Sequence, residues 1–333
     1  MTVDFEFSSE QAELRGVVRD FLKVHKGATW QRLTGELGLT ALAIGAEYGG
    51  AGASLVEVGI VLEEAGAALL PDPLLSTVVA AAALDPALPG AAELLPALAA
   101  GTTVATLAIR ATSGGTATRD GRSYRLDGVW DNVLDGQVAD VFVVAADDCL
   151  FAVRDAAVTR HTTVDTTRGQ ARLVLRGTPG VLVGASTVDH ALDLLRAALA
   201  VESVGVARAS LQSTVDHLKT REQFGVPLAT FQALRHRVAD LAVALEQATS
   251  SAWYALRVAD TCEFAVAAPV AKLLACDAAF DITAAAIQLA GGIGFTWEHP
   301  AHHYLKRATT NRLLAGDPIA LRRLIGRRAG IRP

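Results

Sequence analysis

The sequence is poor in aromatic residues and in cysteine. The first shortage limits how the core can be built, and the second argues against a disulfide-rich or metal-binding protein. Aromatic residues make up 5% of the 333 residues while apolar residues make up 51%, so the core must be built on Ala, Leu and Val, which favour closely packed helices. The three cysteines, Cys149, Cys262 and Cys276, are odd in number and widely spaced. They fit neither a disulfide framework nor a metal site, and a reducing cytosol is expected.

Basic clusters and long unbroken apolar runs are also absent from the sequence. The net charge is −5 and the pI is near 5.9, which argues against a nucleic-acid partner. The N-terminal segment, residues 1–7, is acidic where a secretory signal would be basic. The Ala-rich stretch 77–101 is too interrupted by charge and proline to cross a membrane. We therefore expect a cytoplasmic protein without membrane contact.

Hydrophobic periodicity divides the chain into three zones. Residues 1–101 predict a helical domain, with a capping box that has Ser8 as N-cap and Gln11 three residues later. Residues 102–187 predict a β domain, and residues 188–333 predict a bundle of long antiparallel helices. The expected fold class is mainly α with a small antiparallel β domain.

Individual elements can be placed within these zones. Short β-rich runs alternate with turn signals at 113–115 and 120–121. The runs are Thr103–Ile109, Tyr124–Leu126, Val141–Ala145, Leu150–Val153 and Ala171–Leu175. The expected helices include Leu55–Ala67, Val188–Lys219, Leu228–Ala259, Phe264–Ala290, Ala301–Leu314 and Ile319–Arg327.

Two glycine-bearing segments interrupt the C-terminal helices, at Thr220–Gln232 and Gln288–Thr296. Arg221 can grip a phosphate as a fork, and glycine lets backbone N–H groups approach a ligand closely. The combination suits the pyrophosphate of a dinucleotide. Taken singly, Arg221 could be a surface residue at a helix end, and Gly291 with Gly292 an ordinary helix C-cap. The segment is not a Rossmann fingerprint, because a helix precedes it.

Read together, the pattern R-x-x-F-G…F-Q followed by Q-x-x-G-G-x-G-F-T resembles the C-terminal domain of the acyl-CoA dehydrogenases, which are FAD enzymes. The motif-specific part of the resemblance covers about residues 204–327, and the helix, β, helix order matches the family fold. It implies that Arg221, Gln288 and Gly292 contact the FAD phosphates, and that the aromatic positions pack around the adenosine end. The implied cofactor-binding residues are Arg221, Gln223, Phe224, Leu228, Phe231, Gln232, Gln288, Gly291 and Gly292.

The sequence departs from the family at the catalytic base. In the family a glutamate removes the α-proton of an acyl-CoA thioester while hydride leaves the β-carbon for the flavin. The matching positions here are Ala315 and, for the minority arrangement, Leu195. Asp317 is a weak candidate for a substitute base. Glu202 lies about 10 Å beyond Leu195 by helical rise and is expected to face neither position.

The segments that hold the flavin ring in the family are altered as well. Residues 107–112 replace the usual T-E-P…G-S-D segment, and residues 129–133 replace the W-I-[ST] segment. In family dimers one FAD spans two chains, the ring in one and the adenosine diphosphate end in the other. The chain thus resembles the short subunits of heteromeric actinobacterial acyl-CoA dehydrogenases that act on steroid side-chain CoA thioesters. Its implied partner is a second subunit that carries the glutamate.

Two other interpretations stay open at this point. One is a self-sufficient flavoenzyme of the same fold, with a relocated base or oxygenase-type chemistry. The other is a non-catalytic homodimer. A metal site is not expected, because no second cluster completes the run of Glu298, His299, His302 and His303. Trp130 and Trp253 are predicted core or interface residues.

Overall fold

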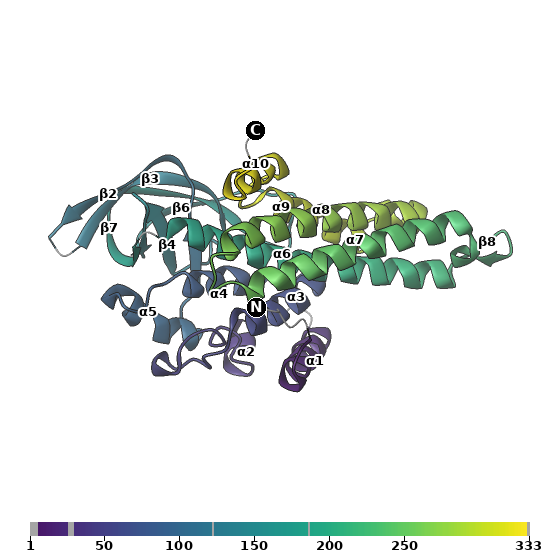
Figure 1. Cartoon of the computed structure of the whole chain (residues 1–333), viewed down its shortest axis with the longest axis horizontal. Coiled ribbons are helices and arrows are strands. Elements are labelled where there is room, and N and C mark those ends of the chain that lie inside the picture. Colours follow the sequence, from purple (N-terminus) through teal and green to yellow (C-terminus); the bar gives the residue numbers. More distant parts are fainter. Residues whose placement is uncertain (1–5, 26–29, 122, 186, 332–333) are drawn as a thin grey trace.

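The computed structural model describes residues 6–25, 30–121, 123–185 and 187–331. Helices come first, a sheet follows and helices return, so the predicted element order is confirmed (Figure 1). The acidic N-terminal residues 1–5 lie outside the described part of the chain. Within that part, no helix is long and apolar enough to cross a membrane.

The N-terminal helices begin at the predicted capping box. The Gln11 backbone N–H donates to Ser8 Oγ at 3.2 Å, and the Ser8 N–H donates to Gln11 Oε1 at 3.1 Å. These bonds satisfy two backbone donors that the first helical turn leaves free. The helices are α1 (Ser9–Val24), α2 (Trp30–Gly35), α3 (Leu55–Ala67), α4 (Leu74–Ala82) and α5 (Pro89–Ala99), with the short 3-10 helix η1 (Ala46–Tyr48).

The sheet has the order β1-β4-β5-β7-β3-β2, with β6 also paired to β7. Its strands are β1 (Ala105–Ala108), β2 (Ala111–Asp120), β3 (Ser123–Leu134), β4 (Val141–Ala146), β5 (Cys149–Val153), β6 (Ala157–Arg160) and β7 (Gln170–Ala185). The pairs are antiparallel as predicted except β1 with β4, which run parallel because the β2–β3 hairpin separates them in the chain. Periodicity missed β2 and β6, whose side chains are mostly exposed.

The predicted turn at 113–115 is wrong. These residues lie inside β2, where the pairing with β3 shifts register on both sides of Ser113–Gly114. Gly114 and Gly115 have φ of 72° and 87°, so the glycines form a β-bulge rather than a chain reversal. The predicted turn at 120–121 is confirmed, since Asp120 faces Ser123 across the hairpin and Gly121 has φ of 64°.

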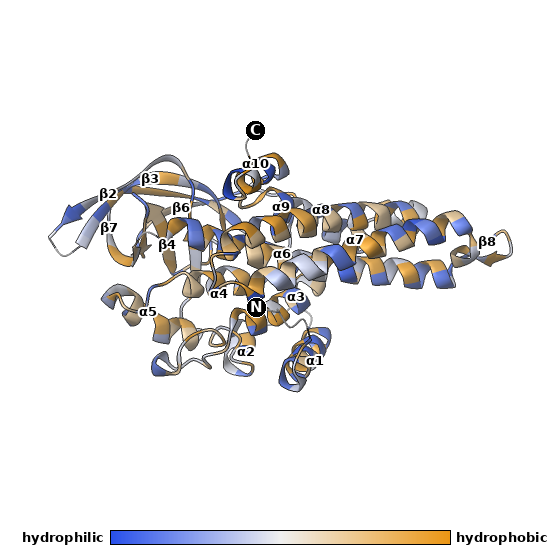
Figure 2. Cartoon of the chain, in the orientation of Figure 1, coloured by the Kyte–Doolittle hydropathy of each residue, from blue (hydrophilic) through white to orange (hydrophobic). Residues whose placement is uncertain are grey.

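The C-terminal helices follow the predicted bounds closely. They are α6 (Val188–Thr220), α7 (Gln232–Arg257), α8 (Phe264–Ala290), α9 (Ala301–Leu313) and α10 (Pro318–Arg328). Figure 2 shows hydrophobic and hydrophilic residues alternating along the bundle helices. α7 begins later than predicted, after a two-stranded turn, β8 (Glu222–Gln223) with β9 (Val226–Pro227), and the 3-10 helix η2 (Leu228–Thr230). Pro227 and Phe231 both have extended backbone, which delays the helix.

α3 and α6 cross in unusually close contact through two glycines. A Cβ added to Gly205 would lie 1.9 Å from the Glu63 carbonyl oxygen, and one added to Gly66 would lie 2.2 Å from the Glu202 carbonyl oxygen. Backbone atoms cannot yield as a flexible side chain does, so any side chain at these positions must separate the helices.

We expect Gly205→Ala to lower the free energy of unfolding by about 1–3 kcal/mol through this overpacking. The control is Gly326→Ala in α10, where an added Cβ meets no atom within 4 Å. Alanine there should be neutral or stabilising by up to about 1 kcal/mol, because glycine is a poor helix former. Urea denaturation of both variants measures the difference, and equal stability of the two would contradict the close crossing.

Candidate functional site

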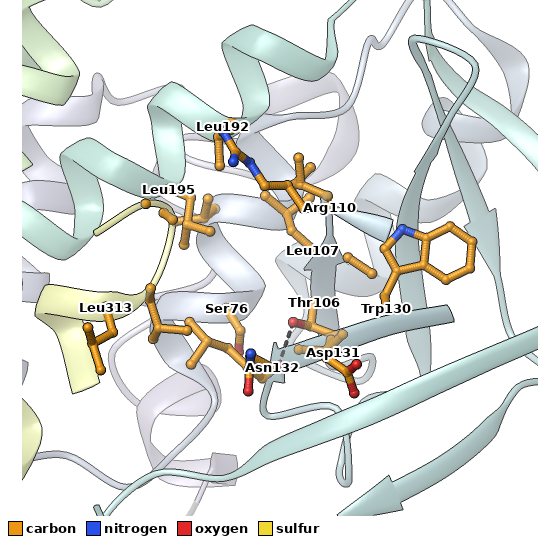
Figure 3. A pocket seen from close by; sticks show the side chains of 18 residues that line it. Ser76, Thr106, Leu107, Arg110, Trp130, Asp131, Asn132, Leu192, Leu195 and Leu313 are labelled. Carbon is orange, nitrogen blue, oxygen red and sulfur yellow. Dashed lines mark hydrogen bonds between the residues drawn. The ribbon is translucent and has the colours of Figure 1, made fainter. Parts of the chain in front are cut away.

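A cavity of about 210 Å³ lies between the sheet and the helices (Figure 3). α4, α6 and the end of α9 supply its helical walls, and β1 and β3 supply the opposite walls. Small-molecule sites usually measure about 300–1,000 Å³, so this cavity is narrow. It is lined by Ser76, Val79, Thr106, Leu107, Ala108, Ile109, Arg110, Trp130, Asp131, Asn132, Val133, Leu134, Leu192, Leu195, Leu313, Leu314, Ala315 and Gly316.

The structure brings the two family base positions to this one cavity. Leu195 on α6 and Ala315 in the α9–α10 turn both line it, although 120 positions separate them in the sequence. Neither side chain can accept a proton. The two altered segments, 107–112 and 129–133, also contribute lining residues. The cavity thus gathers Leu195, Ala315 and residues from both altered segments.

Two buried cations fix the turn that carries Ala315. Arg196 Nε donates to the Ala315 carbonyl oxygen at 3.1 Å. Lys272 Nζ donates to the carbonyl oxygens of Arg312 at 2.7 Å and Gly316 at 2.6 Å. Burial lowers the pKa of Lys272. These bonds hold Ala315 in its left-handed conformation, at φ of 56°. Sequence reasoning missed both cations, and the available signal was a lone lysine within the apolar run 264–290.

The charged residues at the cavity do not provide a free carboxylate. Among the described lining residues only Arg110 and Asp131 have ionisable side chains. Asp131 Oδ1 lies 3.0 Å from Arg172 Nε and 3.4 Å from His161 Nε2, so it is already paired. Arg110 is exposed. Neither of the two charged lining residues therefore offers a free carboxylate that could remove a proton from a substrate.

Asp317 acts as a helix cap. Its Oδ1 accepts hydrogen bonds from the backbone N–H groups of Ile319 at 2.8 Å and Ala320 at 2.9 Å. These bonds to the first turn of α10 lower the pKa of its carboxyl group. Asp317 is not one of the described residues that line the cavity. A carboxylate held in this way is a weak base directed at the backbone.

Trp130 is fully buried on β3, in agreement with the prediction of a core residue. Its indole N–H finds no hydrogen-bond partner among the described residues. Figure 3 shows the ring on the sheet side of the cavity, across from Leu195. A buried donor without a partner is costly, so this N–H is available to a group that enters the cavity.

The first glycine-bearing motif forms an exposed projection at the far end of the bundle, beside β8 in Figure 1. Arg221 is the C-cap of α6 and has an exposed side chain; its own backbone N–H donates to the His217 carbonyl oxygen at 2.8 Å. Phe224 is 92% exposed with φ of 57°, and its ring meets Phe231 edge-on at 6.0 Å. Gln223 and Gln232 are also exposed, while Leu228 is half-buried.

The second motif lies at the same end of the bundle. It follows α8, and its glycines open the 3-10 helix η3 (Gly291–Phe295). His217 of α6 and Ala290 of α8 line one small pocket, so the chain ends that carry Arg221 and Gly291 are neighbours. An added Cβ at Gly291 or Gly292 would meet no atom within 4 Å, and Gln288 is exposed. The arrangement is an open surface with a cation, exposed amides and accessible backbone.

That surface fits the adenosine diphosphate end of FAD. Phosphate oxygens accept hydrogen bonds from a guanidinium fork and from amide donors, and exposed aromatic rings pack against an adenine. The exposure of Phe224 is explained if another molecule covers it. The narrow internal cavity, by contrast, is smaller than most small-molecule sites.

A fully buried charge cluster ties the sheet to the helices. Arg307 of α9 donates to Asp165 Oδ2 at 2.9 Å and to Glu202 Oε1 at 3.0 Å. Arg168 pairs with the same Glu202, and Asn311 Nδ2 donates to Glu202 Oε2 at 2.7 Å. Burial would raise the pKa of Glu202, but the two arginines outweigh it and hold that pKa low. Glu202 faces this cluster and not the cavity, as the sequence predicted.

The described residues hold no group of three or more His, Cys, Asp or Glu side chains placed to bind a metal ion. His302 packs edge-on against Trp297 at 4.7 Å, and the rings of His302 and His303 lie 3.9 Å apart. Lys306 lies 4.3 Å from the centre of the Trp297 ring. This run of polar aromatic residues forms a stacked surface at the start of α9.

Comparison with known proteins agrees with this geometry. Residues 8–88 match the model of the acyl-CoA dehydrogenase N-terminal domain, and residues 183–330 match that of the C-terminal domain. The chain is 37% identical to acyl-CoA dehydrogenase IpdE2 of Mycobacterium tuberculosis over 298 residues, covering 89% of this chain and 85% of that protein.

Two solved structures are similar over nearly the whole chain. A Tcur3481-Tcur3483 steroid ACAD variant has a TM-score of 0.90 at 30% identity, covering 96% of this chain and 98% of that one. The ChsE4-ChsE5 complex from Mycobacterium tuberculosis has a TM-score of 0.91 at 26% identity, covering 99% and 100%. The protein described here therefore belongs to the acyl-CoA dehydrogenase family.

Proposed function

We propose that this chain is the subunit without a catalytic base in a heteromeric, FAD-dependent acyl-CoA dehydrogenase. The observation that carries the proposal is the composition of the cavity, where Leu195 and Ala315 occupy both base positions. A partner subunit of the same family would supply the glutamate and the flavin ring site. The two structural neighbours named above are complexes of two different chains, which supports a hetero-oligomer.

The role of this chain is to close the cofactor site from outside. When bound, FAD supplies the hydride acceptor for α,β-dehydrogenation of an acyl-CoA thioester. Arg221, whose side chain is exposed, would donate charge-assisted hydrogen bonds to the pyrophosphate, and Gln288 and the open Gly291–Gly292 backbone would offer further donors. Phe224 and Phe231 would pack against the adenine. The likeness to a steroid ACAD favours a steroid side-chain thioester as the substrate class.

Flavin content tests the proposal directly. The chain purified alone should be colourless or bind FAD weakly, and it should carry FAD stoichiometrically once assembled with a family member that contains the glutamate. The absorbance near 450 nm, about the usual position for a protein-bound flavin, gives the readout. A stoichiometric yellow homodimer from the chain alone would contradict the shared site.

Arg221→Ala should weaken FAD retention in the assembled complex by about 10- to 150-fold. A hydrogen bond to a charged group contributes roughly 1.5–3 kcal/mol, and each 1.4 kcal/mol is about tenfold in affinity. The matched control is Arg323→Ala, which removes the same charge from an exposed position on α10. Dialysis against FAD-free buffer measures both. Equal retention by the two variants would remove Arg221 from the site.

A second candidate is a self-sufficient flavoenzyme of this fold, favoured by the unpartnered indole N–H of Trp130. That donor could face a ring system held in the chain's own cavity. Trp130→Phe separates the two cases. If the second candidate holds, this variant should release flavin from the chain purified alone. If the first holds, the assembled heteromer should retain FAD as well as it does with Trp130.

A further inference from the structure

A groove of about 770 Å³ lies on a different face of the molecule from the cavity, between α1, α3, α6 and the start of α9. Its volume falls within the usual range of small-molecule sites. It shares no lining residue with the cavity, and none of the residues proposed to hold FAD lines it. Basic, acidic and apolar side chains all line it.

The floor of the groove is acidic but already neutralised. Glu63 and Glu64 of α3 have side chains only 1% and 6% exposed. Arg19 binds both oxygens of Glu64, at 2.7 and 3.0 Å, and Arg208 pairs with Glu63. Arg15 lies behind them, 3.2 Å from Glu63 Oε2. Three guanidinium groups therefore surround two carboxylates.

The lip of the groove is positive. The side chains of Arg19, Lys23 and Arg208 are 44%, 67% and 38% exposed, whereas the glutamates are buried, so the solvent-facing charge is cationic. Burial and the neighbouring Arg15 and Arg19 lower the pKa of Arg208 to about 10, as expected of crowded cations. Two further acids lie nearby: Glu246 is exposed on α7 outside the lining, and Asp20 pairs with Lys23 at 3.4 Å.

Another part of the lining is apolar. Residues 67–71, which follow α3, contribute Leu69, Leu70 and Pro71, and α9 contributes the ring of Tyr304. The Tyr304 hydroxyl donates to the Ala67 carbonyl oxygen at 2.9 Å, so the polar end of that residue is occupied and its ring is left for packing. A groove lined by both apolar residues and exposed cations is complementary to a molecule that has an apolar body and one negative head.

We propose that this groove binds a small amphipathic anion, with its head group on Arg208 and Lys23 and its apolar body along Leu69, Leu70 and Tyr304. The three arginines and two glutamates leave one net positive charge, which one bound negative charge would balance. A guanidinium fork binds a carboxylate with two parallel hydrogen bonds, which favours a carboxylate head. The apolar wall accommodates a hydrocarbon or ring body that would otherwise be exposed to water.

Two fluorescent probes test the proposal on the full chain. They are 1-anilinonaphthalene-8-sulfonate, which is an apolar ring system with one negative charge, and N-phenyl-1-naphthylamine, which has the same rings without the charge. We expect the anionic probe to bind at least about tenfold more tightly, since a hydrogen bond to a charged group is worth that much. Octanoate should displace it, and octanol at the same concentration should not.

Variants locate the site. Arg208→Gln should weaken the anionic probe about tenfold and leave the neutral probe within twofold, and Arg208→Lys should restore most of the affinity. Lys23→Gln is a second test, because its exposed side chain is not needed for folding. Arg323→Gln on α10 is the matched control. If neither Arg208→Gln nor Lys23→Gln changes the affinity, or if both probes weaken equally, the proposal is wrong. Loss of binding on assembly with a partner chain would also overturn it, by showing a protein interface.

Discussion

Replacing Arg307 with methionine should lower the free energy of unfolding by about 3–5 kcal/mol, the usual cost of leaving a buried charge without its partner. The Arg307 side chain is 0% exposed, and the change would leave the buried Asp165 without a cationic partner and remove one of the two donors to Glu202 Oε1. Its other donor contacts, to the Leu70 and Thr167 carbonyl oxygens, would be lost as well. Urea denaturation monitored by circular dichroism measures the change.

The control for this variant is Arg327→Met, an exposed arginine on α10, which should alter stability by no more than about 0.5 kcal/mol. A further variant separates charge pairing from packing. Replacing Asp165, Arg168, Glu202 and Arg307 together by apolar residues of similar volume should cost much less than the single change, because the two buried cations and their two carboxylate partners are then removed together. A loss below about 1 kcal/mol for Arg307→Met would show that water reaches the cluster.

The cluster matters to the site because of what it joins. Asp165 and Arg168 belong to the segment between β6 and β7, Glu202 belongs to α6, and Arg307 and Asn311 belong to α9. The sheet and the helices that wall the cavity are thereby locked together. Hydrogen bonds from Lys272 and Arg196 to backbone carbonyl oxygens fix the α9–α10 turn as well. The base position therefore has a rigid backbone even though its side chain is a methyl group.

Local sequence signals predicted the helices well, because each one depends on neighbouring residues. Ser8 with Gln11 marks a helix start, and the apolar run 264–290 ends at Gly291, where the backbone turns to φ of 69°. The glycines of β2 misled the prediction, since a bulge and a turn both use positive φ. The parallel β1–β4 pair could not be predicted, because it depends on where a hairpin inserted between the strands folds.

The site residues named from the sequence stay predictions, and the contacts that surround them are long-range. Motif matching found Arg221 and Gln288, and alignment identified Leu195 and Ala315, but the sequence does not show that the last two face one cavity. The buried partners of Glu202 come from two segments far from it in the sequence, the β6–β7 connection and α9. No periodicity or spacing connects residues 165, 202 and 307, although a glutamate inside the apolar stretch 191–207 signals a buried partner.

The second large effect concerns turnover. We expect the chain alone, supplied with FAD, to dehydrogenate acyl-CoA thioesters at least about 10²-fold more slowly per flavin than the assembled heteromer, the lower end of what a positioned general base contributes. Reduction of an artificial electron acceptor under saturating thioester measures both rates. A steroid side-chain thioester and a short straight-chain thioester should both be offered, so that a poor substrate is not mistaken for an inactive chain.

Two variants make this result decisive. Asp317→Asn should leave the rate of the assembled complex within about twofold and leave stability unchanged, because asparagine caps a helix as well as aspartate does. Turnover by the chain alone that disappears in Asp317→Asn would instead identify a relocated base. Ala315→Glu restores a carboxylate to the cavity of the chain alone, and we expect it to remain inactive, because segments 107–112 and 129–133 line a cavity of only about 210 Å³. Activity in Ala315→Glu would mean that the flavin ring binds in this chain after all, and that the glutamate is the one group that a partner needs to supply.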